Sequence, residues 1–201
     1  MVYKILLLNQ KGGVGKTTLA DEISFSLERR GFSVAFTSID PQGGCLHKSV
    51  MDNAVIKQSD FHVIDTAGYL KAEMKKWCME ADMILVPILP SPKDFEPTLR
   101  TLELIDSSES WADVYVVVNQ FSSRGVLDRD IVEFFESEDI PIIGYIPRTV
   151  MLSKAAAHNI SVFEYAPKSH VATELEKLTE QIVIARNKNE IRERKTQQQH
   201  Q

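Results

Sequence analysis

A glycine-rich loop near the N-terminus constrains the fold more than any other segment of the chain. The loop consists of Lys11, Gly12, Gly13, Val14, Gly15, Lys16, Thr17 and Thr18. The apolar run 5–8 before it predicts a buried strand, and the apolar spacing over 19–27 after it predicts a helix. A strand, a glycine loop and a helix in this order are typical of a phosphate-binding loop. The alternative, a flexible glycine turn with solvated lysines, leaves the flanking strand and helix unexplained.

The residue types in the loop suit the binding of a nucleoside triphosphate. Glycines allow backbone N–H groups to surround phosphate oxygens, and the helix N-terminus adds a partial positive charge. In such a loop Lys16 contacts the β- and γ-phosphates, and the Thr17 hydroxyl ligates Mg²⁺. An ordinary loop of this class needs one lysine. Lys11 is therefore a second cation in the loop, and its presence restricts the chain to a smaller class of nucleotide-binding proteins.

Strand-like and helix-like segments alternate along most of the chain. Apolar, β-branched runs predict further strands at 33–39, 61–66, 83–89, 114–119 and 142–146. Helical periodicity predicts helices at 70–80, 94–106, 127–137, 150–158 and 170–190. This alternation predicts one α/β domain over residues 1–190, a doubly wound, mostly parallel sheet flanked by helices. Residues 191–201 are polar and rich in glutamine, so we expect a disordered tail.

Composition places few further limits on the chain. Its 201 residues are enough for a core without disulfides or metals, and its net charge of −5 argues against a wholly basic surface. Cys45 and Cys78 are too few for a disulfide framework, so we expect two unpaired thiols in a reducing cytoplasm. No apolar run approaches the roughly 20 residues of a membrane-spanning helix. A strand begins almost at the first residue, so we expect no signal peptide.

Two aspartates stand at the ends of predicted strands. Asp40 follows the strand at 33–39, and Asp65 lies at the end of the strand at 61–66. Open α/β sheets bind ligands at the carboxyl ends of their strands. Asp65 suits a water ligand of Mg²⁺, and Asp40 can orient the attacking water at the γ-phosphate and help to hold the metal. Either aspartate alone is explained as well by a turn or a helix cap; their order after an intact loop favours the functional interpretation.

Together these motifs resemble the ParA-type partition ATPases, a family of P-loop (SIMIBI) fold with a deviant Walker A motif. The family pattern KGGxGKT corresponds to Lys11–Thr17, the DPQ motif to Asp40–Gln42, and the Walker B aspartate to Asp65. The stretches 86–95 and 146–155 are similar to the small, ParF-like plasmid members. The resemblance extends to about residue 184.

The resemblance implies an ATPase that uses ATP and Mg²⁺ and forms a homodimer when ATP is bound. Lys11 corresponds to the signature lysine that crosses the dimer interface to the partner's nucleotide. Catalysis would then involve Lys11, Lys16 and Asp40, with Thr17, Asp40 and Asp65 at the metal. Asn119 and the pair Pro147 and Arg148 lie near adenine by resemblance, although a turn after the strand explains Asn119 equally well.

The family also implies macromolecular partners. A ParB-like centromere-binding protein stimulates hydrolysis, and the ATP-bound dimer binds DNA nonspecifically in the cytoplasm, at the nucleoid. In residues 186–201, Lys and Arg outnumber Asp and Glu by five to two, although a solvated helix end explains such a run as well. The candidate DNA-binding residues are Arg148, Lys154, Lys168, Arg186, Lys188, Arg192, Arg194 and Lys195. Ile191 alone cannot form the apolar face of a membrane-binding helix, so we expect no membrane partner.

Two departures from the family pattern and two alternative functions remain. Ser38 stands where many members have the first of two aspartates, and the segment 40–65 is shorter than expected, so its helix would be trimmed or remodelled. The first alternative is an ATPase that positions a protein cargo, such as a chemoreceptor cluster or a microcompartment. The second is a metabolic ligase of the same fold.

Overall fold

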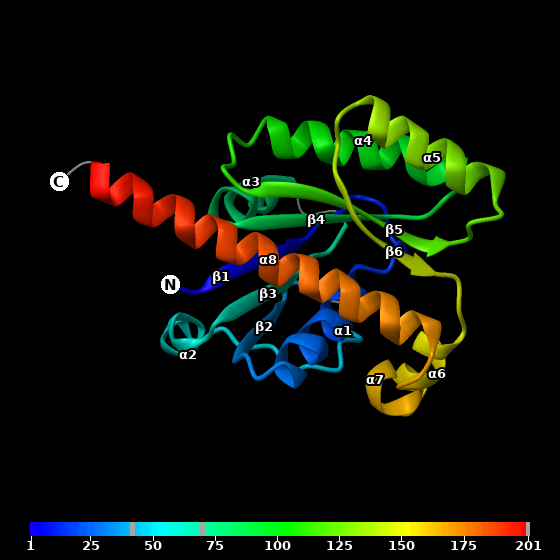
Figure 1. Ribbon diagram of the computed structural model, residues 1–201, viewed down its shortest axis with the longest axis horizontal. Coiled ribbons are helices and arrows are strands. Elements are labelled where there is room, and N and C mark those ends of the chain that lie inside the picture. The colour runs from blue at the N-terminus through cyan, green and yellow to red at the C-terminus, as the bar shows by residue number, and fades with distance from the viewer. Residues whose placement is uncertain (41–42, 69–70, 200–201) are drawn as a thin grey trace.

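The computed structural model describes residues 1–40, 43–68 and 71–199, without the side chains of 71–73 and 192–199 (Figure 1). Its six-stranded sheet has the order β2-β3-β1-β4-β5-β6, and every pair of neighbouring strands is parallel, which confirms the predicted sheet. The strands are β1 (Tyr3–Leu7), β2 (Val34–Ser38), β3 (Phe61–Asp65), β4 (Met83–Ile88), β5 (Asp113–Phe121) and β6 (Ile142–Pro147).

Helices cover both faces of the sheet. One face carries α1 (Lys16–Arg29), α6 (Met151–Ala157), α7 (Val162–Tyr165) and the long α8 (His170–Gln199). The other carries α3 (Lys71–Glu80), α4 (Pro92–Asp106) and α5 (Val126–Ser137). The short α2 (Asn53–Gln58) lies beside the β2 edge (Figure 1).

The two-residue period of the buried strands explains the two layers of helices. Ile5 and Leu7 of β1 pack with α1 and α8, whereas Leu6 and Leu8 pack with the layer of α3, α4 and α5. Successive side chains of a strand point to opposite faces, so a strand that is apolar throughout requires cover on both sides.

Helix α2, between Asp40 and Asp65, has only six residues, in line with the trimmed helix expected there, and is capped by Asp52, whose side chain accepts a hydrogen bond from the Ala54 backbone. The structure differs from the predicted elements in two places. Helix α7 is too short for periodicity to reveal. Helix α8 continues to Gln199, whereas residues 191–201 are predicted to form a disordered tail. The continuation contains no Gly or Pro and is rich in Lys, Arg, Glu and Gln, which are good helix formers.

The last turns of α8 extend past the edge of the sheet (Figure 1). Across the described ranges, no helix combines the length and apolar character needed to cross a membrane. Both cysteines are free, as expected.

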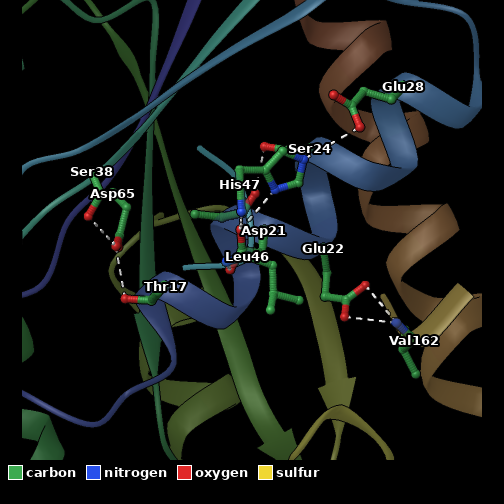
Figure 2. A network of polar contacts seen from close by, with 11 residues as sticks. Thr17, Asp21, Glu22, Ser24, Glu28, Ser38, Leu46, His47, Asp65 and Val162 are labelled. Atoms are coloured by element: carbon green, nitrogen blue, oxygen red, sulfur yellow. Dashed lines mark hydrogen bonds and ion pairs between the residues drawn. The ribbon is translucent and has the colours of Figure 1, made fainter. Parts of the chain in front are cut away.

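A buried acid on α1 fixes the position of α7. Both carboxylate oxygens of Glu22 accept the Val162 backbone N–H, at 2.9 and 3.1 Å (Figure 2). Glu22 is almost fully buried, and burial raises its pKa from an ordinary 4.5 to about 7. The hydrogen bond therefore satisfies one of the backbone N–H groups at the start of α7 that have no partner within the helix. It requires that a carboxylate be removed from water, which is unfavourable for its ionised form.

Glu22→Gln is expected to increase the free energy of unfolding by roughly 2 kcal/mol at about pH 8 and to change it little near about pH 4. The folded protein keeps a proton on Glu22 that the unfolded chain releases between the two pKa values, so stability falls as the pH rises through this range. Urea denaturation at both pH values measures the difference. Glu164→Gln, at an exposed acid of α7, is the control. An unchanged pH dependence in the Glu22 variant would contradict this account.

Candidate nucleotide-binding site

The glycine loop connects β1 to α1 at the carboxyl edge of the sheet. Gly13 and Gly15 have φ values of 79° and 96°, a region that side chains disfavour. The loop borders a cavity of about 500 Å³. Its lining residues are Gln10, Gly12, Gly13, Gly15, Lys16, Thr17, Thr18, Asp40 and Gly68. The structure thus places most of the predicted phosphate-binding residues, with Asp40, around one cavity.

Lys16 points back across the loop. Its ammonium donates a hydrogen bond to the Lys11 carbonyl at 3.1 Å, and its side chain is largely buried. Burial lowers the pKa of Lys16, while the carboxylates of Asp65 and Asp40 oppose that shift. The loop therefore holds a cation that is short of anionic partners, which suits a phosphate ligand.

Asp65 is the most buried acid of the site. Strand register sets it beside Leu7 of β1 and Ser38 of β2. Its Oδ2 accepts hydrogen bonds from the Thr17 hydroxyl at 2.9 Å and the Ser38 hydroxyl at 3.3 Å (Figure 2). Burial raises the pKa of Asp65 to about 6, although both hydroxyl groups oppose the shift. Ser38, at the position where many relatives carry an acid, therefore supports this carboxylate.

These oxygens fit a magnesium ion and its water ligands. The second Asp65 oxygen, Oδ1, is buried and makes no hydrogen bond with any residue that the structure describes. Such an atom calls for a partner. Magnesium prefers oxygen ligands and retains part of its hydration shell. Thr17 and Asp65 are the residues that would hold it, with Asp40 at the same cavity.

Asp40 follows β2 and is half-buried at the rim of the cavity. Its backbone N–H donates to the Ser38 hydroxyl at 3.4 Å, and its carbonyl accepts from the Gly43 backbone at 3.1 Å. The other two residues of the predicted DPQ motif, Pro41 and Gln42, lie outside the described residues.

Asn9 is a residue of the site that the motifs do not reveal. Its amide donates to the Pro87 carbonyl at 2.7 Å and the Thr98 hydroxyl at 3.0 Å. Its carbonyl oxygen accepts the Lys11 backbone N–H at 2.9 Å. Asn9 therefore ties the entrance of the loop to β4 and α4. A polar residue directly after a buried strand was the only signal in the sequence.

The predicted adenine-binding residues divide between two environments. Asn119 is buried against the loop, where its amide donates to the Val14 carbonyl at 2.9 Å. Pro147 lines a separate cavity of about 450 Å³ with the turn after β5, and the Arg148 backbone donates to the Phe121 carbonyl at 3.1 Å. Asn119 thus supports the loop, and a role for any of these residues at the base stays a prediction.

The basic residues predicted to bind DNA are not equally accessible. Arg186 lies over the ring of Phe61, 4.6 Å from its centroid, and pairs with Glu190 at 3.2 Å and Asp60 at 3.8 Å. It is engaged in packing. Four of the other candidates are exposed: Arg148, Lys154, Lys168 and Lys188. The side chains of Arg192, Arg194 and Lys195 lie outside the described ones.

A parallel sheet with a glycine loop between its central strand and a helix defines a P-loop nucleotide-binding protein. The sequence model of the family described as CobQ/CobB/MinD/ParA nucleotide binding domain matches residues 5–162. The chain belongs to this family, which confirms the resemblance drawn from the motifs. It is an ATPase of a family involved in positioning or partition.

Individual proteins that are similar to this chain include members of the same family. The chain is 27% identical over 199 residues to the Maintenance of carboxysome distribution protein A of Halothiobacillus neapolitanus, covering 86% of this chain and 92% of that protein. The septum site-determining protein MinD of Pyrococcus horikoshii, complexed with Mg-ADP, has a TM-score of 0.71 at 16% identity and covers 90% of this chain and 96% of its own. A ParA family ATPase from Chlorobium tepidum has a TM-score of 0.75 at 15% identity, covering 89% and 99%.

Gly15→Ala is expected to weaken ATP binding by about tenfold or more and to destabilise the fold. An added Cβ would lie 2.3 Å from the Asn119 amide nitrogen, and the φ of 96° is itself strained for alanine. Gly31→Ala is the matched control, because Gly31 has a similar φ of 87° and open space around it. It should cost only about 1 kcal/mol of stability and leave ATP binding unchanged. Calorimetric titration and thermal unfolding measure both effects; equal behaviour of the two variants would contradict the close contact.

Proposed function

We propose that this ATPase dimerises on binding ATP, with Lys11 reaching the nucleotide of the partner subunit. The observation that carries the proposal is the contrast between the two lysines of the loop. The Lys16 ammonium is bound to the Lys11 carbonyl inside its own loop. Among the described residues, none makes a hydrogen bond or an ion pair with the Lys11 ammonium. Lys11 is therefore the cation that this subunit leaves for a second nucleotide.

The site residues would divide the work of hydrolysis between them. Asp40 orients the water that attacks the γ-phosphate, while Lys16 and Lys11 stabilise the negative charge that develops on the phosphoryl oxygens. Thr17 and Asp65 would hold Mg²⁺, which supplies charge neutralisation at the β- and γ-oxygens. Because one lysine comes from the partner, dimerisation and nucleotide state form a single switch.

The dimer is further proposed to bind DNA nonspecifically and to act at the nucleoid in the cytoplasm. The exposed Lys and Arg residues of the described chain, together with the basic C-terminal end of α8, would contact the phosphates of the DNA backbone. A ParB-like centromere-binding protein would stimulate hydrolysis and so release the dimer from DNA.

The cargo has two candidates. Plasmid partition is our first, from the ParF-like stretches of the sequence. Positioning of a protein cargo is the second, and the match to a carboxysome distribution protein over most of both chains supports it. The two differ in the adaptor: a plasmid requires a partner that binds a centromere sequence, whereas a protein body requires one that binds its components. A metabolic ligase would need a small substrate, so a measurement of ATP-dependent dimerisation without one would argue against it.

Lys11→Ala is expected to abolish ATP-dependent dimerisation while leaving ATP binding by the monomer within about threefold of normal, because the Lys11 ammonium acts in the other subunit. Light scattering with a nonhydrolysable ATP analogue measures the dimer, and calorimetry measures binding. Lys57→Ala, at an exposed lysine of α2, is the control, and Lys16→Ala should lose binding itself. A Lys11 variant that dimerises normally would refute the role in trans.

DNA binding is expected with the ATP analogue and not with ADP, and a chain ending at Glu190 should bind more weakly. This truncation removes Arg192, Arg194 and Lys195 but keeps the packed Arg186. The dependence of log K on log salt should become shallower by about 0.9 for each phosphate that the shortened chain no longer neutralises. Fluorescence anisotropy over a salt series measures the slope. If the truncated and full-length chains gave the same slope, the end of α8 would have no role in DNA binding. Equal DNA binding with ADP and with the ATP analogue would contradict control of DNA binding by the nucleotide.

A further inference from the structure

The segment that follows Asp40 is fastened to α1 by one buried carboxylate. Asp21 is almost inaccessible to solvent. It accepts hydrogen bonds from the Leu46 backbone at 2.8 Å, the His47 backbone at 3.0 Å and His47 Nδ1 at 2.8 Å (Figure 2). Three bonds to an ionised group are stronger and better oriented than the same bonds to a neutral acceptor. The attachment is therefore specific and strong.

The His47 ring lies between two carboxylates of the same helix. Its Nδ1 faces Asp21 and its Nε2 lies 3.4 Å from Glu28 Oε2 (Figure 2). The ring also packs against Phe25, with centroids 4.1 Å apart, and stacks on Phe36 at 5.1 Å. Only 11% of the side chain is exposed. Both ring nitrogens can donate only when the ring is protonated, so the imidazolium suits this position best.

The far end of the same segment is attached to β2. The Val50 backbone N–H donates to the Phe36 carbonyl at 2.7 Å, and the Thr37 hydroxyl donates to the Val50 carbonyl at 2.6 Å. The Ser38 backbone donates to the Ser49 hydroxyl at 3.1 Å. Residues 43–50 therefore form a bridge between α1 and β2.

This bridge connects the two halves of the candidate active site. Asp21 lies one helical turn after Thr17 on α1, the helix whose first residue is Lys16. On the other side, Leu46 is six residues beyond Asp40. The clamp formed by Asp21, Glu28, Leu46 and His47 thus holds against α1 the segment whose first described residue, Gly43, donates a backbone hydrogen bond to the Asp40 carbonyl at 3.1 Å.

We infer that His47 is a positioning residue for hydrolysis: held by Asp21 and Glu28, it keeps Asp40 in place over the γ-phosphate. The inference rests on the proposed role of Asp40 in hydrolysis. It concerns the rate of the chemical step rather than nucleotide binding, because the lining of the loop does not include the clamp. A misplaced water-orienting group lowers kcat more than it raises KM.

The clamp should also give hydrolysis a pH dependence. Burial lowers the pKa of His47, but Asp21 and Glu28 outweigh it and raise the pKa above the ordinary 6.5. A further titratable group that interacts with His47 is Glu22 of α1, while β2 packs the uncharged Phe36 against the ring. The pKa is higher in the folded state, so the clamp is complete below about pH 6.5 and loosens as the pH rises through the folded value.

His47→Asn and Asp21→Asn test the inference. Asparagine at 47 retains a donor toward Asp21 and removes the contact with Glu28. We expect kcat to fall by about tenfold at neutral pH in either variant, with KM for ATP within about twofold of normal. The ratio of wild-type to His47→Asn activity should decline from about pH 6 to about pH 9, because only the wild type loses a proton from residue 47. Hydrogen exchange of the Leu46 and His47 amides should accelerate in Asp21→Asn.

Asp52→Asn is the matched control, since Asp52 also accepts a backbone N–H in this part of the chain, at 2.8 Å from Ala54, yet it lies on the far side of the bridge. It should leave kcat and the pH profile unchanged. Wild-type kcat with an unchanged pH profile in both clamp variants would overturn the inference. So would loss of ATP affinity in step with kcat, which indicates a general structural role. A separate variant distinguishes failure of the proposed function from failure of the role of His47. If Asp40 has no part in hydrolysis, Asp40→Ala will hydrolyse ATP at the wild-type rate.

Discussion

The structure depends above all on one buried carboxylate at the carboxyl edge of the sheet. Asp65 lies between β2 and β1, and its position requires that three segments end together: the strand that leads into the glycine loop, the strand that leads to Asp40, and its own. An ionised acid in such a place is unfavourable unless hydroxyl groups, a cation or a metal compensate it. Two hydroxyl groups bond one oxygen and Lys16 lies nearby, while the second oxygen has no partner among the described residues. The site is therefore electrostatically incomplete, and the proposed nucleotide and magnesium ion would supply the missing partners.

Two glycines allow close approaches of the backbone around the site. A Cβ at Gly68 would lie 2.8 Å from the Gln10 carbonyl, and one at Gly15 would meet the Asn119 amide. Asn9 and Asn119 then fix the loop from behind by bonds to its backbone. A loop held in this manner is preorganised, so little of the binding energy of phosphate is spent on ordering it.

The parallel sheet, the helices that flank it and the phosphate loop could be predicted, because each is indicated by a pattern of residues close together in the sequence. Apolar runs of β-branched residues mark buried strands, and a glycine loop before a helix marks phosphate binding. The contributions of Asn9 and Asp21 were not predictable, because each depends on a residue far away in the sequence that a period or a motif does not identify. The remodelled segment after Asp40 was expected from its length alone. Its actual path depends on Asp21, one of several polar residues that α1 buries. The sequence does not indicate the full length of α8, because its polar composition predicts disorder there whereas its helix propensity predicts a helix.

Helix α1 not only follows the glycine loop but also binds two distant segments of the chain. Consecutive buried acids, Asp21 and Glu22, each bind the backbone of a distant segment, the first at Leu46 and His47 and the second at Val162. Charged residues are rarely buried without partners, and here both partners are backbone N–H groups whose own satisfaction depends on the acids. A shift of α1 by even part of a turn would break several charge-assisted bonds at once, so the helix and the two segments must move together or not at all. Since α1 begins at Lys16, these two segments are bound to the same helix that follows the proposed phosphate-binding loop. One of them follows Asp40 and the other precedes α8, so the proposed catalytic group and the basic helix proposed to bind DNA are each next in the chain to a segment bound to this helix.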